Sequence, residues 1–186
     1  MNYMRKEKIY IRILEETDIP TTTQWMNDVE ISDSQGYLPA FCLQNQLEWF
    51  RRIKEDKTRY IFAICNNTDG EHIGNVGLGN IDYIHRHCMF SIFIYDSKNR
   101  NKGAGAEATE LALEFAFNKL NMNKVYLRAS EKRLEAIGLY TKLGFVKEGV
   151  MRQHYYSNGK YEDKIIYSIL KSEFDEQNKV KNFQEK

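Results

Sequence analysis

The segment from Phe90 to Phe117 constrains the fold more than any other part of the sequence. Residues 90–95 combine aromatic and β-branched side chains, which is typical of a buried or half-buried strand. After a polar loop, alanine, leucine and phenylalanine recur every three or four positions from Ala104 to Ala116, which predicts a helix. The helix would leave its glutamates facing solvent, namely Glu107, Glu110 and Glu114. The order is therefore strand, basic glycine-containing loop and helix.

The loop has the features of a phosphate-binding turn. The start of a helix offers unpaired N–H groups and about half a unit of positive charge. Gly103 and Gly105 lack the Cβ atoms that would keep an anion away, and Arg100 and Lys102 add full charges. The sequence therefore predicts that phosphate groups of a ligand bind at this helix start.

Three phosphate-binding patterns compete for this loop. The P-loop pattern G-x-x-x-x-G-K-[ST] does not occur in the sequence. The dinucleotide pattern G-x-G-x-x-A fits Gly103–Ala108, and Glu131 lies about where a ribose-binding acid would follow. However, residues 96–102 separate these glycines from the strand, and too little chain remains for a doubly wound sheet. The third pattern, [RQ]-x-x-G-x-[GA], is met by Arg100–Gly105 between a strand and a helix.

Length and charge narrow the class of protein. A chain of 186 residues predicts one domain over residues 1–186. The net charge of +1 argues against nucleic acid or a membrane surface as a partner. Cys42, Cys65 and Cys88 are far apart and odd in number, so we expect buried reduced thiols and no metal site. No apolar run approaches the length of a membrane span, and we expect a cytoplasmic protein.

The remaining pattern predicts strands and helices along the chain. Strands are expected at 8–14, 59–65, 72–78, 81–87, 124–129, 145–150, 153–156 and 161–170. Helices are expected from Asp18 through Met26, over 43–54 and over 133–143, where Gly144 would end the helix in a left-handed conformation. Residues 27–42 read as loop with room for one turn of helix, and the charged residues 171–186 as a frayed tail.

A second motif gives the chain a family resemblance. The segment Glu135–Phe145 resembles N-x-x-A-[IL]-x-x-Y-x-[KR]-x-G-F of the GNAT superfamily of N-acetyltransferases, and Arg100–Gly105 resembles that family's acetyl-CoA pyrophosphate loop. The resemblance covers nearly the whole chain and implies a single α/β (α+β) domain. Its mixed, mostly antiparallel central sheet would be flanked by helices, with strands that splay at the cofactor site. Trp25–Asp28 and Tyr155–Tyr161 are similar to the branch with ribosomal-protein, spermidine and amino-sugar N-acetyltransferases.

The resemblance also implies a cofactor site for acetyl-CoA without a metal. The strand backbone would pair with pantetheine, and the loop would bind pyrophosphate. Arg133 replaces the family's asparagine, and it either contacts the cofactor or faces water; Asn101 replaces a common glycine. The implied cofactor residues are Ile92, Phe93, Ile94, Arg100, Asn101, Lys102, Gly103, Ala104, Gly105, Ala106 and Arg133.

Tyr140 is the catalytic residue that the resemblance implies. A phenol with a pKa near ~10 stays protonated at neutral pH and can protonate a departing thiolate, whose conjugate thiol has a pKa near ~8.5. The alternative is a helix aromatic that packs on the sheet. Spermidine-type relatives carry a glutamate where this chain reads Cys88–Ser91, so the carboxylate base is missing. Its substitutes are Glu30, His85, His87, Asp82 or a bound water, although each side chain is also a plausible structural group.

The acceptor expected from the resemblance is the primary amine of a small molecule, either a polyamine or an amino sugar. A protein N-terminus and a non-catalytic CoA-binding module are the alternatives, and a homodimer is compatible with all three. Trp25, Tyr37 and Phe41 either line an acceptor pocket or belong to the core.

Overall fold

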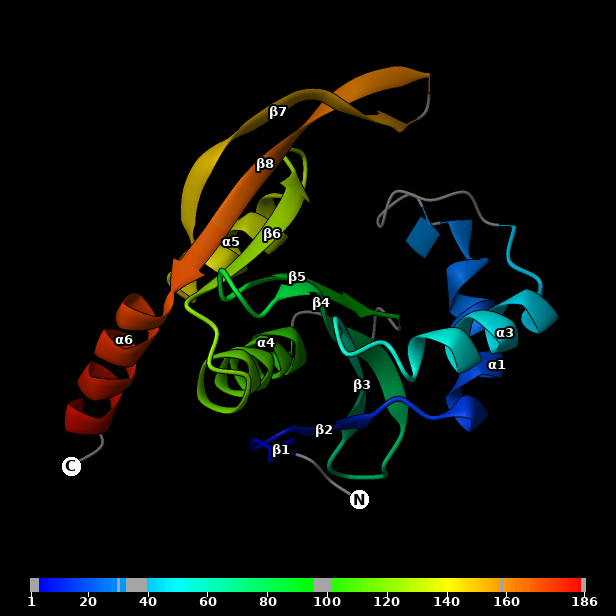
Figure 1. The fold of residues 1–186 in the computed structure, drawn as a ribbon, viewed down its shortest axis with the longest axis horizontal. Helices are drawn as coiled ribbons and strands as arrows, with labels where there is room; N and C mark the ends of the chain where they lie inside the picture. The colour runs from blue at the N-terminus through cyan, green and yellow to red at the C-terminus, as the bar shows by residue number, and fades with distance from the viewer. Residues whose placement is uncertain (1–3, 30, 33–39, 96–101, 158, 185–186) are drawn as a thin grey trace. The chain divides into compact units, whose positions relative to one another are not determined.

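The protein is a mixed α/β fold with a mostly antiparallel sheet, as predicted (Figure 1). The computed structural model describes residues 4–29, 31–32, 40–95, 102–157 and 159–184. Its strands are β1 Met4–Arg5, β2 Ile9–Ile13, β3 Tyr60–Asn66, β4 His72–Asp82, β5 His87–Ile94, β6 Lys124–Ser130, β7 Val146–Ser157 and β8 Lys160–Leu170, in the sheet order β1-β2-β3-β4-β5-β6-β8-β7. The helices are α1 Ile19–Met26, α3 Leu43–Ile53, α4 Ala104–Glu114, α5 Leu134–Lys142 and α6 Lys171–Gln184, with a 3-10 turn η1 at Glu16–Asp18 and a π-helical turn η3 at Phe115–Lys119.

The chain divides into two compact units. Unit 1 comprises Met1–Gly79 and Ser91–Ala112, and unit 2 comprises Asn80–Phe90 and Leu113–Lys186. Strand β5 contributes its first half to unit 2 and its second half to unit 1. The single domain expected from the length stays a prediction.

Unit 1 contains an antiparallel sheet covered by two helices. β2 pairs with β3 at Ile11↔Ile64, and β3 pairs with β4 at Phe62↔Val76. Helices α1 and α3 lie side by side, and α3 contributes buried Phe50 and the partly buried Leu47 and Ile53 to the core. The core under these helices consists of Leu14, Ile19, Phe50, Ala63 and Cys65.

Unit 2 contains a long hairpin beside β6. β7 and β8 pair from Val146↔Ser168 to Ser157↔Lys160, and β6 pairs with β8 from Lys124↔Leu170 to Ser130↔Lys164 (Figure 1). β6 also runs parallel to the start of β5. Alternate residues of these strands point to opposite faces of the sheet, so one half of their side chains lies on each face.

Four expectations require correction. Residues 81–87 are not a separate strand, because the Asp82 carboxylate accepts hydrogen bonds from the N–H groups of Ile84 and His85 at 2.9 and 2.7 Å and forms a turn before β5. The two strands expected at 145–156 are one strand, β7, with register shifts. Residues 171–184 form α6, which buries Phe174 against Phe117 at 5.1 Å between ring centroids. Cys42 is exposed, whereas Cys65 and Cys88 are buried.

Candidate active site

The predicted phosphate-binding turn lies at the start of α4 in unit 1. Gly103 has a φ of +92°, which is the left-handed conformation that glycine adopts without strain. Lys102, Gly103 and the first residues of α4 follow each other as the sequence predicts. Arg100 and Asn101 lie outside the described residues. The described part of the turn therefore has a left-handed residue at Gly103, directly before α4.

Lys8 is a residue near this turn that sequence analysis did not identify. Its ammonium donates a hydrogen bond to the Lys102 carbonyl at 2.9 Å and would lie 3.1 Å from a Cβ added at Gly103. The Glu107 carboxylate accepts hydrogen bonds from the N–H groups of Lys8 and Ile9 at 2.9 and 3.2 Å. Glu107 therefore holds the first turn of α4 against β2 and does not simply face solvent. A contact between residues 99 positions apart leaves no local signal in the sequence.

The second half of β5 lies close to β4. The Tyr95 N–H donates to the Ile73 carbonyl at 2.9 Å, and a Cβ at Gly74 would collide with the Phe93 carbonyl oxygen. Gly74 is therefore required by the close approach of two backbones. The side chains of Ile92, Phe93 and Ile94 are half-buried, and their pairing with pantetheine stays a prediction.

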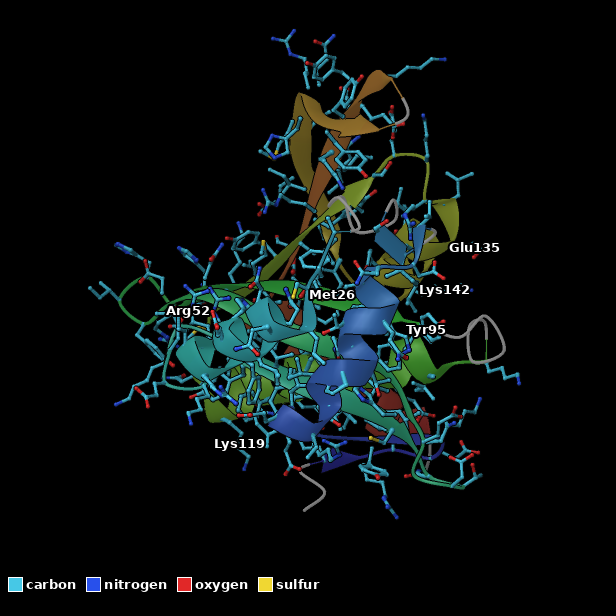
Figure 2. The ribbon with its side chains drawn as sticks, turned by 90° about the vertical axis from the view of Figure 1, so that its right-hand side faces the viewer. Met26, Arg52, Tyr95, Lys119, Glu135 and Lys142 are labelled. Atoms are coloured by element: carbon cyan, nitrogen blue, oxygen red, sulfur yellow. The ribbon has the colours of Figure 1, made fainter. Side chains whose placement is uncertain are left out.

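Trp25 is packed into the core of unit 1. Its side chain is 5% exposed and packs edge-on against His72 at 4.7 Å and stacks on Tyr95 at 5.0 Å, measured between ring centroids. Tyr95 is labelled in Figure 2 at the end of β5. Phe41 closes the early loop, because its backbone exchanges two hydrogen bonds of 2.8 Å with the Asn27 side chain. Tyr37 and Glu30 lie outside the described residues.

Tyr140 occupies α5 in unit 2, between Glu135 and Lys142, which Figure 2 labels. Its half-buried ring packs edge-on against Phe90 at 6.3 Å and Phe145 at 5.7 Å. Gly144 ends the helix with a φ of +84°, as predicted, and the turn brings Phe145 back onto the tyrosine. No described residue forms a hydrogen bond with the Tyr140 hydroxyl. This packing is compatible with a proton donor and with a helix aromatic that only packs on the sheet.

The protonation of Tyr140 suits a proton donor. Burial raises the pKa of the phenol, and the Arg133 charge lowers it to a smaller extent. The net shift is upward, so the phenol is neutral at physiological pH and can give up a proton only to a developing base. Arg133 itself is exposed at the N-cap of α5, and no carboxylate among the described residues pairs with it.

Three candidates for a general base, Asp82, His85 and His87, contact one another in and next to the turn between β4 and β5. Asp82 forms that turn, and its hydrogen bond from the His85 N–H is the main reason that its pKa is lowered. His85 is exposed and stacks on His87 at 6.5 Å, and His87 lies 3.9 Å from Asp82. These geometries favour structural roles, so none of the three is assigned as the base.

His72 in unit 1 is a buried polar residue that sequence analysis missed. Its Nε2 lies 2.9 Å from the Gly74 carbonyl and 2.8 Å from Asn75 Oδ1, both of which are acceptors. Burial lowers the pKa of His72, so the neutral ring carries its proton on Nε2. Nδ1 faces Asp18 at 3.6 Å, and Asp18 is held by a bidentate pair with Arg12 at 2.7 Å. The cluster connects α1 to β4 and reads as structural.

The parallel pairing of β5 with β6 is short. It joins His87, Cys88 and Met89 to Lys124, Val125 and Tyr126, and among the described residues no further pair of these two strands follows. β6 continues to Ser130 through its pairing with β8. Phe90, the next residue of β5, is the one that Tyr140 contacts.

Comparison with known proteins identifies the family. The family description "Acetyltransferase (GNAT) domain" matches residues 8–146. The spermidine N(1)-acetyltransferase of Escherichia coli K12 is 30% identical over 168 residues, which cover 89% of this chain and 88% of that protein. The putative ribosomal N-acetyltransferase YdaF of Bacillus subtilis is 29% identical over 107 residues, or 58% of each chain.

The solved structures agree with this assignment. A crystal structure of spermidine N-acetyltransferase from Vibrio cholerae, in complex with CoA and spermine, superimposes with a TM-score of 0.85 at 28% identity and covers 89% of this chain and 97% of that chain. No helix in the described part of the chain is both long and apolar enough to cross a membrane. The chain therefore belongs to the GNAT family and is an acetyl-CoA-dependent N-acetyltransferase.

Proposed function

We propose that the protein transfers the acetyl group of acetyl-CoA to the primary amine of a small molecule, either a polyamine or an amino sugar, by direct attack in a ternary complex. The neutral, half-buried phenol of Tyr140 at the motif position is the observation that carries this proposal. The spermidine N-acetyltransferases among the relatives support a small amine as acceptor.

The reaction needs one bond formed, one broken and two proton transfers. The neutral amine nitrogen attacks the thioester carbonyl, a C–N bond forms, and the C–S bond breaks. Tyr140 gives its phenolic proton to the departing thiolate. The phenol, whose pKa is raised, is protonated before the reaction, and the thiol that forms stays protonated at neutral pH. The amine loses a proton to a bound water or an unassigned base, which allows Tyr140 to be reprotonated.

The cofactor is proposed to bind through the residues implied by the family resemblance. The helix start at Lys102–Ala106 would bind the pyrophosphate, because N–H groups at a helix N-terminus attract anions. The backbone of Ile92–Ile94 would pair with pantetheine. Arg133 would add an exposed contact of about 1 kcal/mol or less, and loss of the salt dependence of CoA affinity in Arg133→Gln would identify such a contact. The cytoplasmic location and the homodimer stay predictions from the sequence.

Turnover of acetyl-CoA against a panel of amines tests the proposal. The panel contains spermidine, glucosamine and a peptide with a free N-terminus, and thiol release is measured at saturating acetyl-CoA. We expect a small amine to be acetylated at least tenfold more efficiently than the peptide. A preference for the peptide would favour a protein N-terminus as the acceptor. Binding of CoA without turnover would leave only a binding module.

A further inference from the structure

Unit 2 carries cations that form no ion pair with a carboxylate of the described residues. Arg128 on β6 and Lys164 on β8 point to the same face of the sheet, because Lys164 pairs with Ser130, two residues along from Arg128. Arg128 Nη2 contacts Met89 Sδ at 3.4 Å and Nη1 lies 3.4 Å from His154 Nε2, while the Lys164 ammonium lies 4.3 Å from the Tyr155 ring centroid. None of these partners is a carboxylate. We call Arg128, Lys164 and the adjacent Arg133 the cationic face.

The carboxylates near this face are already paired. Glu162 binds Lys132 and Ser130, and Glu148 binds Lys124 and Ser168. By contrast, none of the three cations of the cationic face forms an ion pair with a described residue. Burial lowers the pKa of Lys164, the charges of Arg133 and Arg128 lower it further, and the Glu162 carboxylate opposes these effects only in part. Like charges held close together destabilise a fold unless a ligand offsets their repulsion.

The cationic face lies next to the proposed acid. Met89, which Arg128 contacts, is followed by Phe90, which Tyr140 contacts. Successive residues of a strand point to opposite faces, so Arg128, which contacts Met89, and the phenol, whose ring contacts Phe90, flank β5 from opposite sides. Arg133 acts electrostatically on both Tyr140 and Lys164. A ligand held by the cations would therefore lie beside the strand at which the proposed acid acts.

We propose that the cationic face binds an anionic group of the acceptor, so that the substrate is an amine that also carries a phosphate or a carboxylate, such as a phosphorylated amino sugar, and not a polycation. The inference rests on the proposed function and narrows its acceptor. Arg128 would bind the anion through its planar fork of N–H donors, and Lys164 would add a partly desolvated charge. Spermidine would meet like charges at the same place.

The test compares acceptors that differ only in charge. We measure kcat/KM at saturating acetyl-CoA for glucosamine 6-phosphate, glucosamine, L-alanine and spermidine. Wild type is expected to prefer glucosamine 6-phosphate over glucosamine at least tenfold, and L-alanine reports whether a carboxylate replaces the phosphate. In Arg128→Gln and Lys164→Gln this preference should fall about tenfold or more, as expected for a lost charge-assisted hydrogen bond, with KM for acetyl-CoA unchanged.

Lys147→Gln is the matched control, because Lys147 is an exposed cation of unit 2 that pairs with Tyr167 on the other face of the sheet. It should leave the preference unaltered. Three results would overturn the inference. Spermidine could be the best acceptor, both variants could keep the wild-type preference, or the variants could raise only KM for acetyl-CoA. Turnover of no amine counts against the proposed function instead. In that case, calorimetry with CoA-loaded protein tests the anion site directly. Glucosamine 6-phosphate is expected to bind wild type and to bind Arg128→Gln more weakly. The absence of binding to wild type would overturn the inference.

Discussion

Replacement of Tyr140 by phenylalanine separates an acid catalyst from a packing residue. The substitution keeps the ring contacts with Phe90 and Phe145 and deletes only a hydroxyl that no described residue binds. The free energy of unfolding should therefore change by less than about 1 kcal/mol. If the phenol protonates the thiolate, kcat should fall about a hundredfold or more, which corresponds to about 2.7 kcal/mol in the barrier.

The assay is thiol release under saturating acetyl-CoA and acceptor, with CoA affinity measured by calorimetry as the control for binding. A catalyst that loses its acid loses activity as pH rises through the phenol pKa, and burial places that pKa above its usual value. Arg133 lowers the same pKa, so Arg133→Gln should move the alkaline limb to higher pH. Wild-type kcat in Tyr140→Phe, with chemistry shown to limit the rate, would refute the assignment and leave Tyr140 as a packing residue.

Three further predictions follow from backbone shape, packing and charge. Gly103→Ala forces an alanine to a φ of +92° near Lys8, which should cost about 1–2 kcal/mol and weaken CoA binding about tenfold in calorimetry, whereas Gly138→Ala, which meets no atom within 4 Å, should not weaken it. Phe174→Ala should lower the free energy of unfolding by about 3–5 kcal/mol in urea titrations, because its ring is buried against Phe117. Burial raises the pKa of Asp18, but hydrogen bonds from Arg12 and the Glu15 N–H outweigh burial and lower the pKa overall. The ionised Asp18 carboxylate therefore stabilises the fold above the unfolded pKa of about 3.9, and this stabilisation is lost as pH falls below that value. Asp18→Asn should destabilise by about 3–5 kcal/mol at neutral pH and remove that part of the acid dependence; equal stability losses at pH 7 and pH 2 would contradict this.

The parts of the fold that could be predicted are governed by local patterns. The apolar period of α4, the aromatic and β-branched end of β5 and the left-handed Gly144 each follow from a few neighbouring residues. The turn at 83–86 was missed, because a single side chain, Asp82, decides it by accepting two backbone N–H groups. Apolar alternation alone reads such a segment as strand.

The parts that could not be predicted depend on partners distant in the sequence. Glu107 fits a solvent-facing position by period, yet it binds backbone N–H groups of β2. The sequence leaves Trp25 as either a pocket residue or a core residue, and only its packing against His72 and Tyr95 places it in the core. Phe174 lies in a charged tail, and its contact with the distant Phe117 anchors the helix that forms there.

The missing carboxylate near β5 and the cationic face have a common physical basis. Within Cys88–Ser91, Cys88 and Phe90 are buried at 0% and 3% exposure, and burial raises the pKa of the Cys88 thiol to about 12, so an ionised carboxylate there would be strongly disfavoured. Met89 points to the other face, and its sulfur contacts Arg128. A glutamate at 89 would pair with Arg128 and neutralise it, whereas methionine leaves the positive charge in force. Methionine at 89 therefore leaves Arg128 without a carboxylate partner on the face of β5 opposite Tyr140, which is the condition that the proposed anion site requires.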